Sequence, residues 1–265
     1  VVPILQERNQ FSRGRRPPRF TFPRARGEFI ALCEGDDYWT SPDKLQRQVD
    51  AMRRHPEIDL CVHPAMRLSM RTGKRKKGFD HGPNERIVPP EKVIARHNQF
   101  APTASVLMRC EAAQAMPEWF FKAPDLPVGD FFIEAILGKK GVLYLPETMS
   151  VYRRNVPGSY TQRFQNSASE DLEDSLERMI YFTEQLRSTE GLPEAALNQR
   201  LSYIRLNYAL QFLAIGDRER FDQVSRQIRR LGHWGLSHAL SAIRHNRFGF
   251  WAGRHAFLQF RRLSN

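Results

Sequence analysis

The chain has 265 residues, of which 41% are hydrophobic and 11% aromatic, and this composition excludes a disordered protein. Lys and Arg number 41 against 29 Asp and Glu, so the formal net charge is +12 and the isoelectric point is near 10.0. The charge favours a polyanionic partner: nucleic acid, an anionic membrane surface or phosphorylated small molecules.

The cysteines and the apolar runs narrow the class of protein. Cys33, Cys61 and Cys110 are widely spaced and form no C-x-x-C pair, which predicts neither a disulfide framework nor a zinc site and is typical of a reducing cytosol. The apolar run FIALC is far shorter than the roughly 18 residues that a bilayer-spanning helix needs. We therefore expect no transmembrane segment.

The first predicted element is an irregular basic arm, assigned to residues 1–26. Seven arginines and no acid lie between Arg8 and Arg26. No helix-turn-helix, RNP-type or zinc pattern accompanies this charge. We therefore do not expect nucleic acid to be the partner.

A short buried strand, GEFIALC, follows the arm and leads into the acidic stretch CEGDDYW. Glu34, Asp36 and Asp37 repel one another there unless a cation or a helix N-terminus offsets their charge. Carboxylate oxygens suit Mg²⁺ or Mn²⁺, which bridge to phosphate oxygens, but acids also occur before helices simply because the dipole favours them. Tyr38 and Trp39 either wall a ligand or pack in the core.

The next predicted element is a helix that Pro56 ends. We expect Ser41 to cap it and Pro42 to occupy its first position. Apolar residues then recur at helical spacing, namely Leu45, Val49 and Met52.

Strands and helices continue to alternate up to residue 164. A strand region IDLCVHPAMRLSM precedes the Gly- and Lys-rich loop RTGKRKKGFDHGP, a short helix around PEKVIARH and a strand ASVLM. The alternation predicts an α/β layer over residues 27–164, in which ligands gather at the carboxyl ends of strands. The acidic stretch lies at such an end.

From residue 165 the pattern predicts only amphipathic helices, and we assign residues 165–265 to an all-helical region. Gly216 and Asp217 mark a helix stop and a helix start, so residues 198–231 are predicted to form a helical hairpin. The closing segment either lies on an anionic membrane or packs on the α/β part, since it mixes arginines with aromatic residues: Phe248, Phe250, Trp251, Phe257 and Phe260.

The stretch RARGEFIALCEGDDYWTSPDKLQRQVDAM is similar to the middle of a family 2 glycosyltransferase, where a strand delivers a D-x-D-type motif, an aromatic residue and P-x-K-L-x-x-Q. FAPTASVLMR resembles the family's T-x-S-x-x-x-R strand. VGDFFIEAILGKKGVLYLPETMSVYRRN resembles its [EG]-D segment, helix, strand and Y-R ending. The resemblance covers about residues 5–165 and implies a partial GT-A-like core followed by the helical region.

The resemblance also implies roles for single residues. Glu34, Asp36 and Asp37 would hold Mn²⁺ or Mg²⁺ and, through it, the diphosphate of a nucleotide-sugar donor. Asp130 matches the catalytic base, although spacing alone equally makes it a helix N-cap after Gly129.

Arg153 stands where the family places a basic residue near the diphosphate. Trp39 is a candidate to stack on the donor. Asn155 occupies the position at which many relatives carry a histidine, so the YRRN ending departs from the pattern.

The implied function is metal-dependent, inverting transfer of a sugar to a hydroxyl of a glycan or lipid-linked acceptor, as in cell-surface polysaccharide synthesis. The implied location is the cytoplasm or the inner face of the membrane. The family normally opens with T-Y-N- and D-D-G-S-type segments that bind the nucleoside, which nothing here matches. We therefore expect a shortened chain, inactive alone, with GEFIALC at an open sheet edge. An inactive subunit acting in assembly and, less favoured, a basic nucleic-acid-binding protein remain as alternatives.

Overall fold

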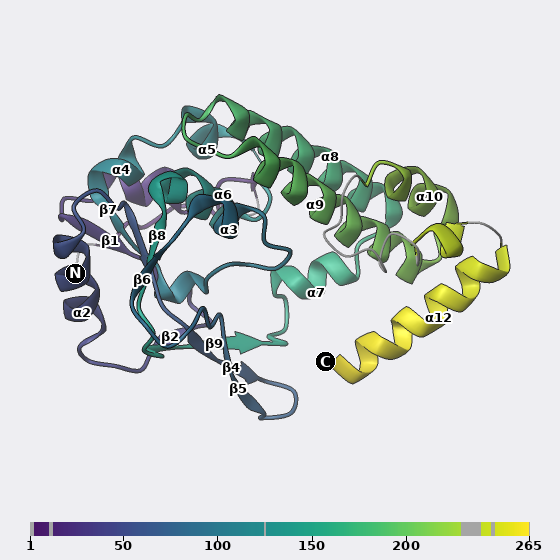
Figure 1. The fold of residues 1–265 in the computed structure, drawn as a ribbon, viewed down its shortest axis with the longest axis horizontal. Coiled ribbons are helices and arrows are strands. Elements are labelled where there is room, and N and C mark those ends of the chain that lie inside the picture. Colours follow the sequence, from purple (N-terminus) through teal and green to yellow (C-terminus); the bar gives the residue numbers. More distant parts are fainter. Residues whose placement is uncertain (1–2, 11–12, 125, 229–239, 245–246, 265) are drawn as a thin grey trace.

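The computed structural model describes residues 3–10, 13–124, 126–228, 240–244 and 247–264. These residues form a mixed α/β protein with two mixed β-sheets and a helical C-terminal region (Figure 1). The expected alternation of strands and helices, followed by helices alone, is therefore confirmed at this coarse level.

The larger sheet has five strands in the order β1-β7-β3-β8-β6. In this sheet β3 and β8 are parallel and the other neighbouring strands are antiparallel, so the carboxyl ends of its strands do not share one edge. The predicted strands GEFIALC and ASVLM correspond to β1 and β7, and β1 is an edge strand that pairs with β7 among the described residues. The strands are β1 (Phe29–Ala31), β3 (Leu60–Val62), β6 (Arg86–Val88), β7 (Leu107–Arg109) and β8 (Val142–Tyr144).

The smaller sheet has the order β2-β9-β4-β5 and arises partly where strands were not expected. The predicted strand region after Pro56 breaks at His63 and Pro64, so its first half enters the larger sheet and its second half the smaller one. The predicted Gly- and Lys-rich loop contains a strand that forms a hairpin with β4. The strands are β2 (Tyr38–Trp39), β4 (Ala65–Ser69), β5 (Arg75–Gly78) and β9 (Ser150–Arg154).

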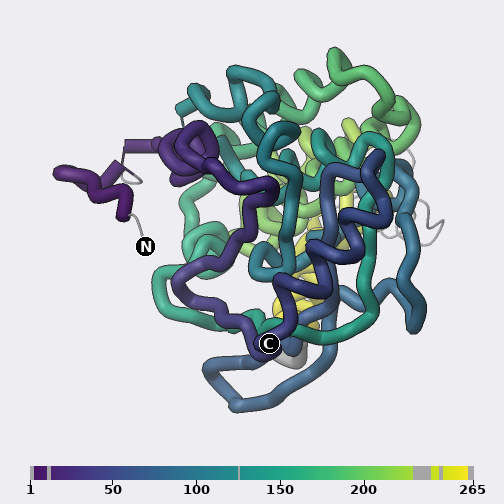
Figure 2. Tube along the Cα trace, turned by 90° about the vertical axis from the view of Figure 1, so that its left-hand side faces the viewer, coloured from purple at the N-terminus to yellow at the C-terminus, as the bar shows by residue number. Residues whose placement is uncertain are grey.

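The segment assigned to a wholly irregular arm is partly helical. Phe22, at the start of a 3-10 turn, is buried and its ring lies 6.4 Å from that of Phe120. Residues 3–10 project from the body (Figure 2). The short helices that surround the sheets are α1 (Pro18–Thr21), α3 (Pro90–Ile94), α4 (Cys110–Gln114), α5 (Glu118–Lys122) and α6 (Gly129–Leu137), with 3-10 turns η2 (Phe22–Arg24), η3 (Thr103–Ser105) and η4 (Gly138–Lys140).

The helix predicted after the acidic stretch is α2 (Lys44–Arg54), and it begins later than Ser41 and Pro42 suggested. Its buried face also differs, because Lys44 and Gln48 are fully buried whereas Leu45 is 39% exposed. The Lys44 ammonium donates to Gln48 Oε1 at 2.7 Å, and Gln48 Nε2 donates to the carbonyl of Ser105 at 2.8 Å. Through this pair, α2 is hydrogen-bonded to η3, the 3-10 turn that precedes β7.

The helical region begins at α7 and contains the predicted hairpin. Gly216 takes a left-handed φ of 91° at the end of α9, and Asp217 caps α10 by accepting from the backbone N–H of Arg220 at 3.0 Å. The prediction is confirmed for this turn, although residues 229–231 lie outside the described residues. The elements are α7 (Tyr160–Gln165), α8 (Ser169–Gln185), η5 (Leu186–Ser188), α9 (Glu194–Ile215), α10 (Arg218–Arg226) and α12 (Arg247–Ser264).

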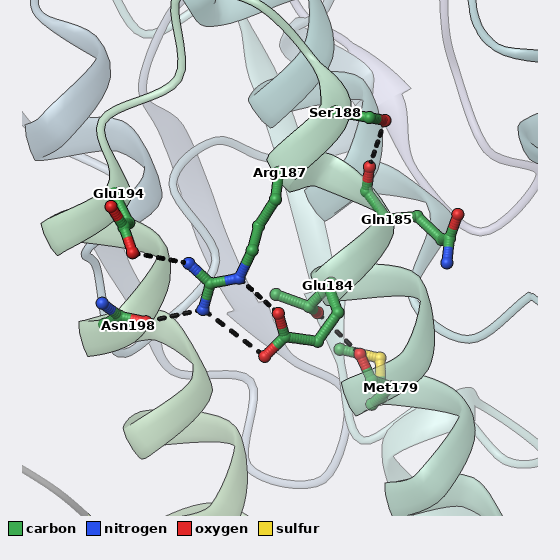
Figure 3. A network of polar contacts seen from close by, with 8 residues as sticks. Met179, Glu184, Gln185, Arg187, Ser188, Glu194 and Asn198 are labelled. Atoms are coloured by element: carbon green, nitrogen blue, oxygen red, sulfur yellow. Dashed lines mark hydrogen bonds and ion pairs between the residues drawn. The ribbon is translucent and has the colours of Figure 1, made fainter.

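The α8–α9 turn is fastened by Arg187 (Figure 3). Its guanidinium donates to Asn198 Oδ1 at 2.6 Å and to Glu194 Oε1 at 3.4 Å on α9, and it pairs with Glu184 on α8. One buried cluster continues from the larger sheet into α8 and α9, so the hydrophobic core crosses the predicted boundary at residue 165. The helical region is therefore packed on the α/β part through a shared core.

The aromatic residues of α12 divide between the core and the solvent. Phe250 is 1% exposed and its ring lies 5.5 Å from that of Phe221 on α10. Phe248 is 83% exposed and Phe260 is 65% exposed. Within the described residues, no helix combines the length and apolar character that crossing a membrane requires.

Phe250→Ala should lower the free energy of unfolding by about 3 to 5 kcal/mol, because it leaves a cavity between α12 and α10. Phe248→Ala, on the same helix but exposed, should change it by less than about 0.5 kcal/mol. Urea unfolding of both variants measures the difference. Equal effects would contradict the packing of α12 through Phe250.

Candidate functional site

The acidic stretch forms a tight turn between the two sheets. It leaves β1, closes through a hydrogen bond from the N–H of Asp37 to the carbonyl of Glu34 at 3.1 Å, and enters β2. Since β2 pairs with β9, with Tyr38 opposite Val151, the turn lies beside the end of β9. We call residues 34–37 the acidic loop.

Arg153 on β9 holds the acidic loop through main-chain groups. Its backbone N–H donates to Asp37 Oδ1 at 2.9 Å. Its guanidinium donates to the carbonyl oxygens of Asp36 and, at 3.4 Å, of Gly35. The structure thus places Arg153 at the predicted site, where it fixes the loop backbone and neutralises part of its charge.

Asp37 is the most enclosed of the loop carboxylates. It is 7% exposed, and its Oδ2 is buried without a hydrogen-bond partner. Burial raises the pKa of Asp37 to about 6, and the Asp36 carboxylate adds to the rise. An unsatisfied buried carboxylate oxygen is costly, and a cation would relieve that cost.

Asp130, far away in the sequence, lies close enough to the acidic loop to act on it electrostatically. Glu34 keeps solvent-exposed area, yet desolvation by surrounding protein atoms raises its pKa to about 7, with Asp130 the next cause and the other loop acids after it. A hydrogen bond with the Thr103 side chain opposes the rise. The fold therefore brings Asp130 within electrostatic reach of Glu34, the first residue of the acidic loop.

Asp130 is not a helix N-cap in this structure. Helix α6 starts at Gly129, and Val128, with a left-handed φ of 46°, precedes it as the N-cap residue. Asp130 Oδ1 accepts from the next N–H, that of Phe131, at 3.0 Å, and Oδ2 accepts from Gln99 Nε2 at 2.6 Å. Desolvation raises the pKa of Asp130, which increases its strength as a base.

Trp39 lies at the edge of this region and is 36% exposed. Its indole N–H donates to the carbonyl of Ala104 at 2.9 Å, and the Lys44 ammonium lies 4.3 Å from its ring centroid. Burial lowers the pKa of Lys44 to about 8. Trp39 is thus neither a core residue nor a free side chain, but a fixed aromatic surface beside the acidic loop.

A buried carboxylate behind Asp130 was missed by the sequence reasoning. Glu134 lies one turn further along α6 and accepts from the N–H of Ala101 at 2.9 Å. Arg200 of α9 reaches the same region, lies 4.1 Å from the Phe131 ring centroid, and donates to the carbonyl of Arg96 at 2.7 Å. The i, i+4 spacing of the two acids on α6 was the available signal. Thr103 is the first residue of the T-x-S-x-x-x-R match, whereas Gln99 carried no signal in the sequence.

Whether a divalent cation fits the acidic loop depends on the oxygen atoms that the loop offers. No three His, Cys, Asp or Glu residues lie together as a metal-binding group in the part of the chain that the structure describes. Mg²⁺, however, is commonly held by one or two carboxylates together with substrate phosphates and water. The unsatisfied Oδ2 of Asp37 and the neighbouring Asp36 fit that arrangement, with Glu34 as an outer carboxylate.

Comparisons with known proteins define relatives but no function. No family model matches the chain. Two similar proteins are uncharacterized protein Rv1520 of Mycobacterium tuberculosis and uncharacterized protein Mb1547 of Mycobacterium bovis, each 32% identical over 223 residues. Each match covers 77% of this chain, and the chain spans 60% of the length of each relative.

The raised pKa of Glu134 predicts a pH-dependent stability. Burial raises it to about 8, the Asp130 carboxylate adds to the rise, and Arg200 opposes it. The folded protein therefore binds this proton more tightly than the unfolded chain does. Glu134 should accordingly make the free energy of unfolding fall as the pH rises from about 4.5 to about 8.

In Glu134→Gln the new side chain cannot ionise, but it keeps an oxygen that accepts from the N–H of Ala101. The part of the pH-dependent fall in the free energy of unfolding that Glu134 causes should therefore disappear. Urea unfolding of both proteins at a series of pH values measures it. The other acids titrate in both proteins, so the difference between the two curves isolates Glu134. Parallel curves would show that Glu134 does not titrate as described.

Proposed function

We propose that this protein is a glycosyltransferase with a GT-A-like core, which transfers a sugar from a nucleotide-sugar donor to a hydroxyl acceptor. The resemblance of residues 5–165 to family 2 glycosyltransferases supplies the reaction class. The observation that carries the proposal is the unsatisfied, buried Oδ2 of Asp37 in an acidic loop whose Glu34 lies within electrostatic reach of Asp130. The chain spans 60% of the length of the matched relatives, so we propose the activity for proteins of that full length.

Asp130 is the proposed catalytic base. Gln99 and the N–H of Phe131 hold its two oxygens, and desolvation makes it more basic. It would take the proton from the acceptor hydroxyl as that oxygen attacks the anomeric carbon, which inverts the configuration while the nucleoside diphosphate leaves. General-base catalysis of this kind contributes roughly 10²- to 10⁴-fold in rate.

The acidic loop is the proposed diphosphate site. Asp36 and Asp37 would hold Mg²⁺ or Mn²⁺, and the ion would offset the negative charge that develops on the leaving diphosphate. Arg153 keeps the loop backbone in place through its donations to the carbonyls of Gly35 and Asp36. Trp39 offers a fixed aromatic face on which a sugar ring or base can stack.

Asp37→Asn tests the cation site, because it preserves shape and the bond from the Arg153 N–H but removes the charge. Mn²⁺ binding, with and without UDP or GDP, should weaken at least tenfold, as measured from the electron paramagnetic resonance signal of free Mn²⁺. The free energy of unfolding without metal should rise by about 1 to 3 kcal/mol at pH 8, because a pKa raised by about 2 units penalises the charged form.

Asp50→Asn is the matched control, since Asp50 is an exposed acid on α2 whose Oδ1 accepts from Gln46 Nε2 at 2.8 Å. Asp50→Asn should leave both Mn²⁺ binding and the free energy of unfolding unchanged. Loss of stability in Asp37→Asn with unchanged Mn²⁺ binding would make Asp37 a purely structural residue.

Asp130→Asn should reduce turnover by roughly 10²- to 10⁴-fold while donor binding survives. An asparagine can still accept from the N–H of Phe131, and Gln99 can turn its amide to offer oxygen to the new NH₂. Consumption of a panel of nucleotide sugars with glycan acceptors measures turnover. Near-normal turnover would remove Asp130 from the chemistry.

We propose further that α12 places the protein on an anionic membrane surface. Phe248 and Phe260 are its most exposed aromatic residues, and no acid follows Asp222 in the sequence. Phe248→Ser with Phe260→Ser should lower co-sedimentation with phosphatidylglycerol vesicles at least tenfold. Undiminished co-sedimentation of this variant would contradict the proposal.

A further inference from the structure

A pocket of about 240 Å³ lies beside α7, away from the acidic loop. Its walls come from residues 14–16, from the α7 segment and from the facing side of α8. Three arginines line it, namely Arg16, Arg163 and Arg178, and its lining contains no Asp or Glu. A lining with three arginines and no carboxylate gives the pocket a positive potential, which favours an anionic ligand.

The pocket is also lined by residues with hydroxyl groups. Tyr160 and Ser175 belong to its lining, and Ser175 Oγ is hydrogen-bonded to Tyr208 OH at 2.6 Å. A phosphate or carboxylate would accept from such donors, and guanidinium groups are the side chains best matched to these anions.

The pocket adjoins the proposed base. Arg16 and Tyr160 both interact electrostatically with Asp130. Arg16 also lies against the start of α6, because a Cβ on Gly129 would sit 3.6 Å from its Nη1. None of the acidic-loop residues lines the pocket. Asp130 therefore has an acidic neighbourhood from the loop and a basic one from this pocket.

We propose that the pocket binds an anionic group, phosphate or carboxylate, carried by a sugar residue of the acceptor. This assignment rests on the proposed function, since it makes Asp130 the base between the donor's diphosphate and the acceptor. The volume is below the roughly 300 to 1,000 Å³ of pockets for drug-sized ligands, so it suits one small charged group with part of a sugar ring rather than a nucleotide. The apolar walls, from Phe164 and Leu172, suit the face of such a ring.

The test is calorimetric titration of the full chain in EDTA with glucose 1-phosphate, glucuronate and uncharged glucose. At least one of the two anionic sugars should bind at least tenfold more tightly than glucose, and the tighter one identifies the anion as phosphate or carboxylate. Arg163→Gln and Arg178→Gln should each weaken that binding at least tenfold. Arg163→Lys, which keeps the charge, should retain most of it.

Arg226→Gln is the matched control, because Arg226 is an exposed arginine on α10 that pairs with Asp222 at 2.8 Å. This variant should bind the anionic sugar as tightly as the wild type does. Equal binding of all three sugars, or normal binding in both glutamine variants, would overturn the proposal. Asp37→Asn should bind the anionic sugar normally in EDTA. This arm separates the pocket from the cation site, so failure of either assignment can be recognised without the other.

Discussion

Burial of carboxylates, in the acidic loop and at Asp130, is the constraint on which the site depends. Desolvation raises the pKa values of Glu34, Asp37 and Asp130, and neighbouring carboxylates add to the rise at Glu34 and Asp37, so the fold holds these groups in place at a cost in free energy. Pairing of β2 with β9 keeps the loop in place, and Arg153 fastens its carbonyls. Since destabilising charge clusters are concentrated at functional sites, the arrangement fits a protein that binds a cation and a diphosphate there.

The helical region takes part in positioning this site. Arg200 of α9 packs on the Phe131 ring next to Asp130 and hydrogen-bonds to the carbonyl of Arg96. The hydrophobic core continues from the larger sheet into α8 and α9, so displacement of these helices would disturb α6. The Arg-lined pocket is likewise built from both parts. The helical region is thus a support for Asp130 as well as a candidate membrane contact.

Local signals in the sequence predicted the elements that local interactions determine. The turn between α9 and α10 follows from Gly216, which tolerates a positive φ, and from Asp217, whose side chain caps the next helix. The strand before the acidic loop follows from its apolar run. The grouping of Asp130 with that loop came from the resemblance, because neither periodicity nor composition relates segments so far apart.

Long-range partners explain the elements that were mispredicted. Apolar periodicity placed Leu45 inside, but Lys44 and Gln48 are buried because Trp39 and Ser105 supply their partners. Strand β5 has a basic sequence with weak strand propensity, and it forms because β4 offers a hairpin partner. The Arg-lined pocket had no sequence signature at all, since its three arginines come from three separate segments.

The measurement that tests the central claim most directly is a crystal structure of the protein soaked in Mn²⁺, analysed by anomalous scattering. We expect an anomalous peak at the acidic loop, at about 2.0 to 2.3 Å from carboxylate oxygens of Asp36 and Asp37. The N–H of Arg153 should keep its bond to Asp37 Oδ1. A structure in which Mn²⁺ binds elsewhere, or in which Asp37 Oδ2 instead pairs with a protein donor, would contradict the cation site and with it the proposed transferase.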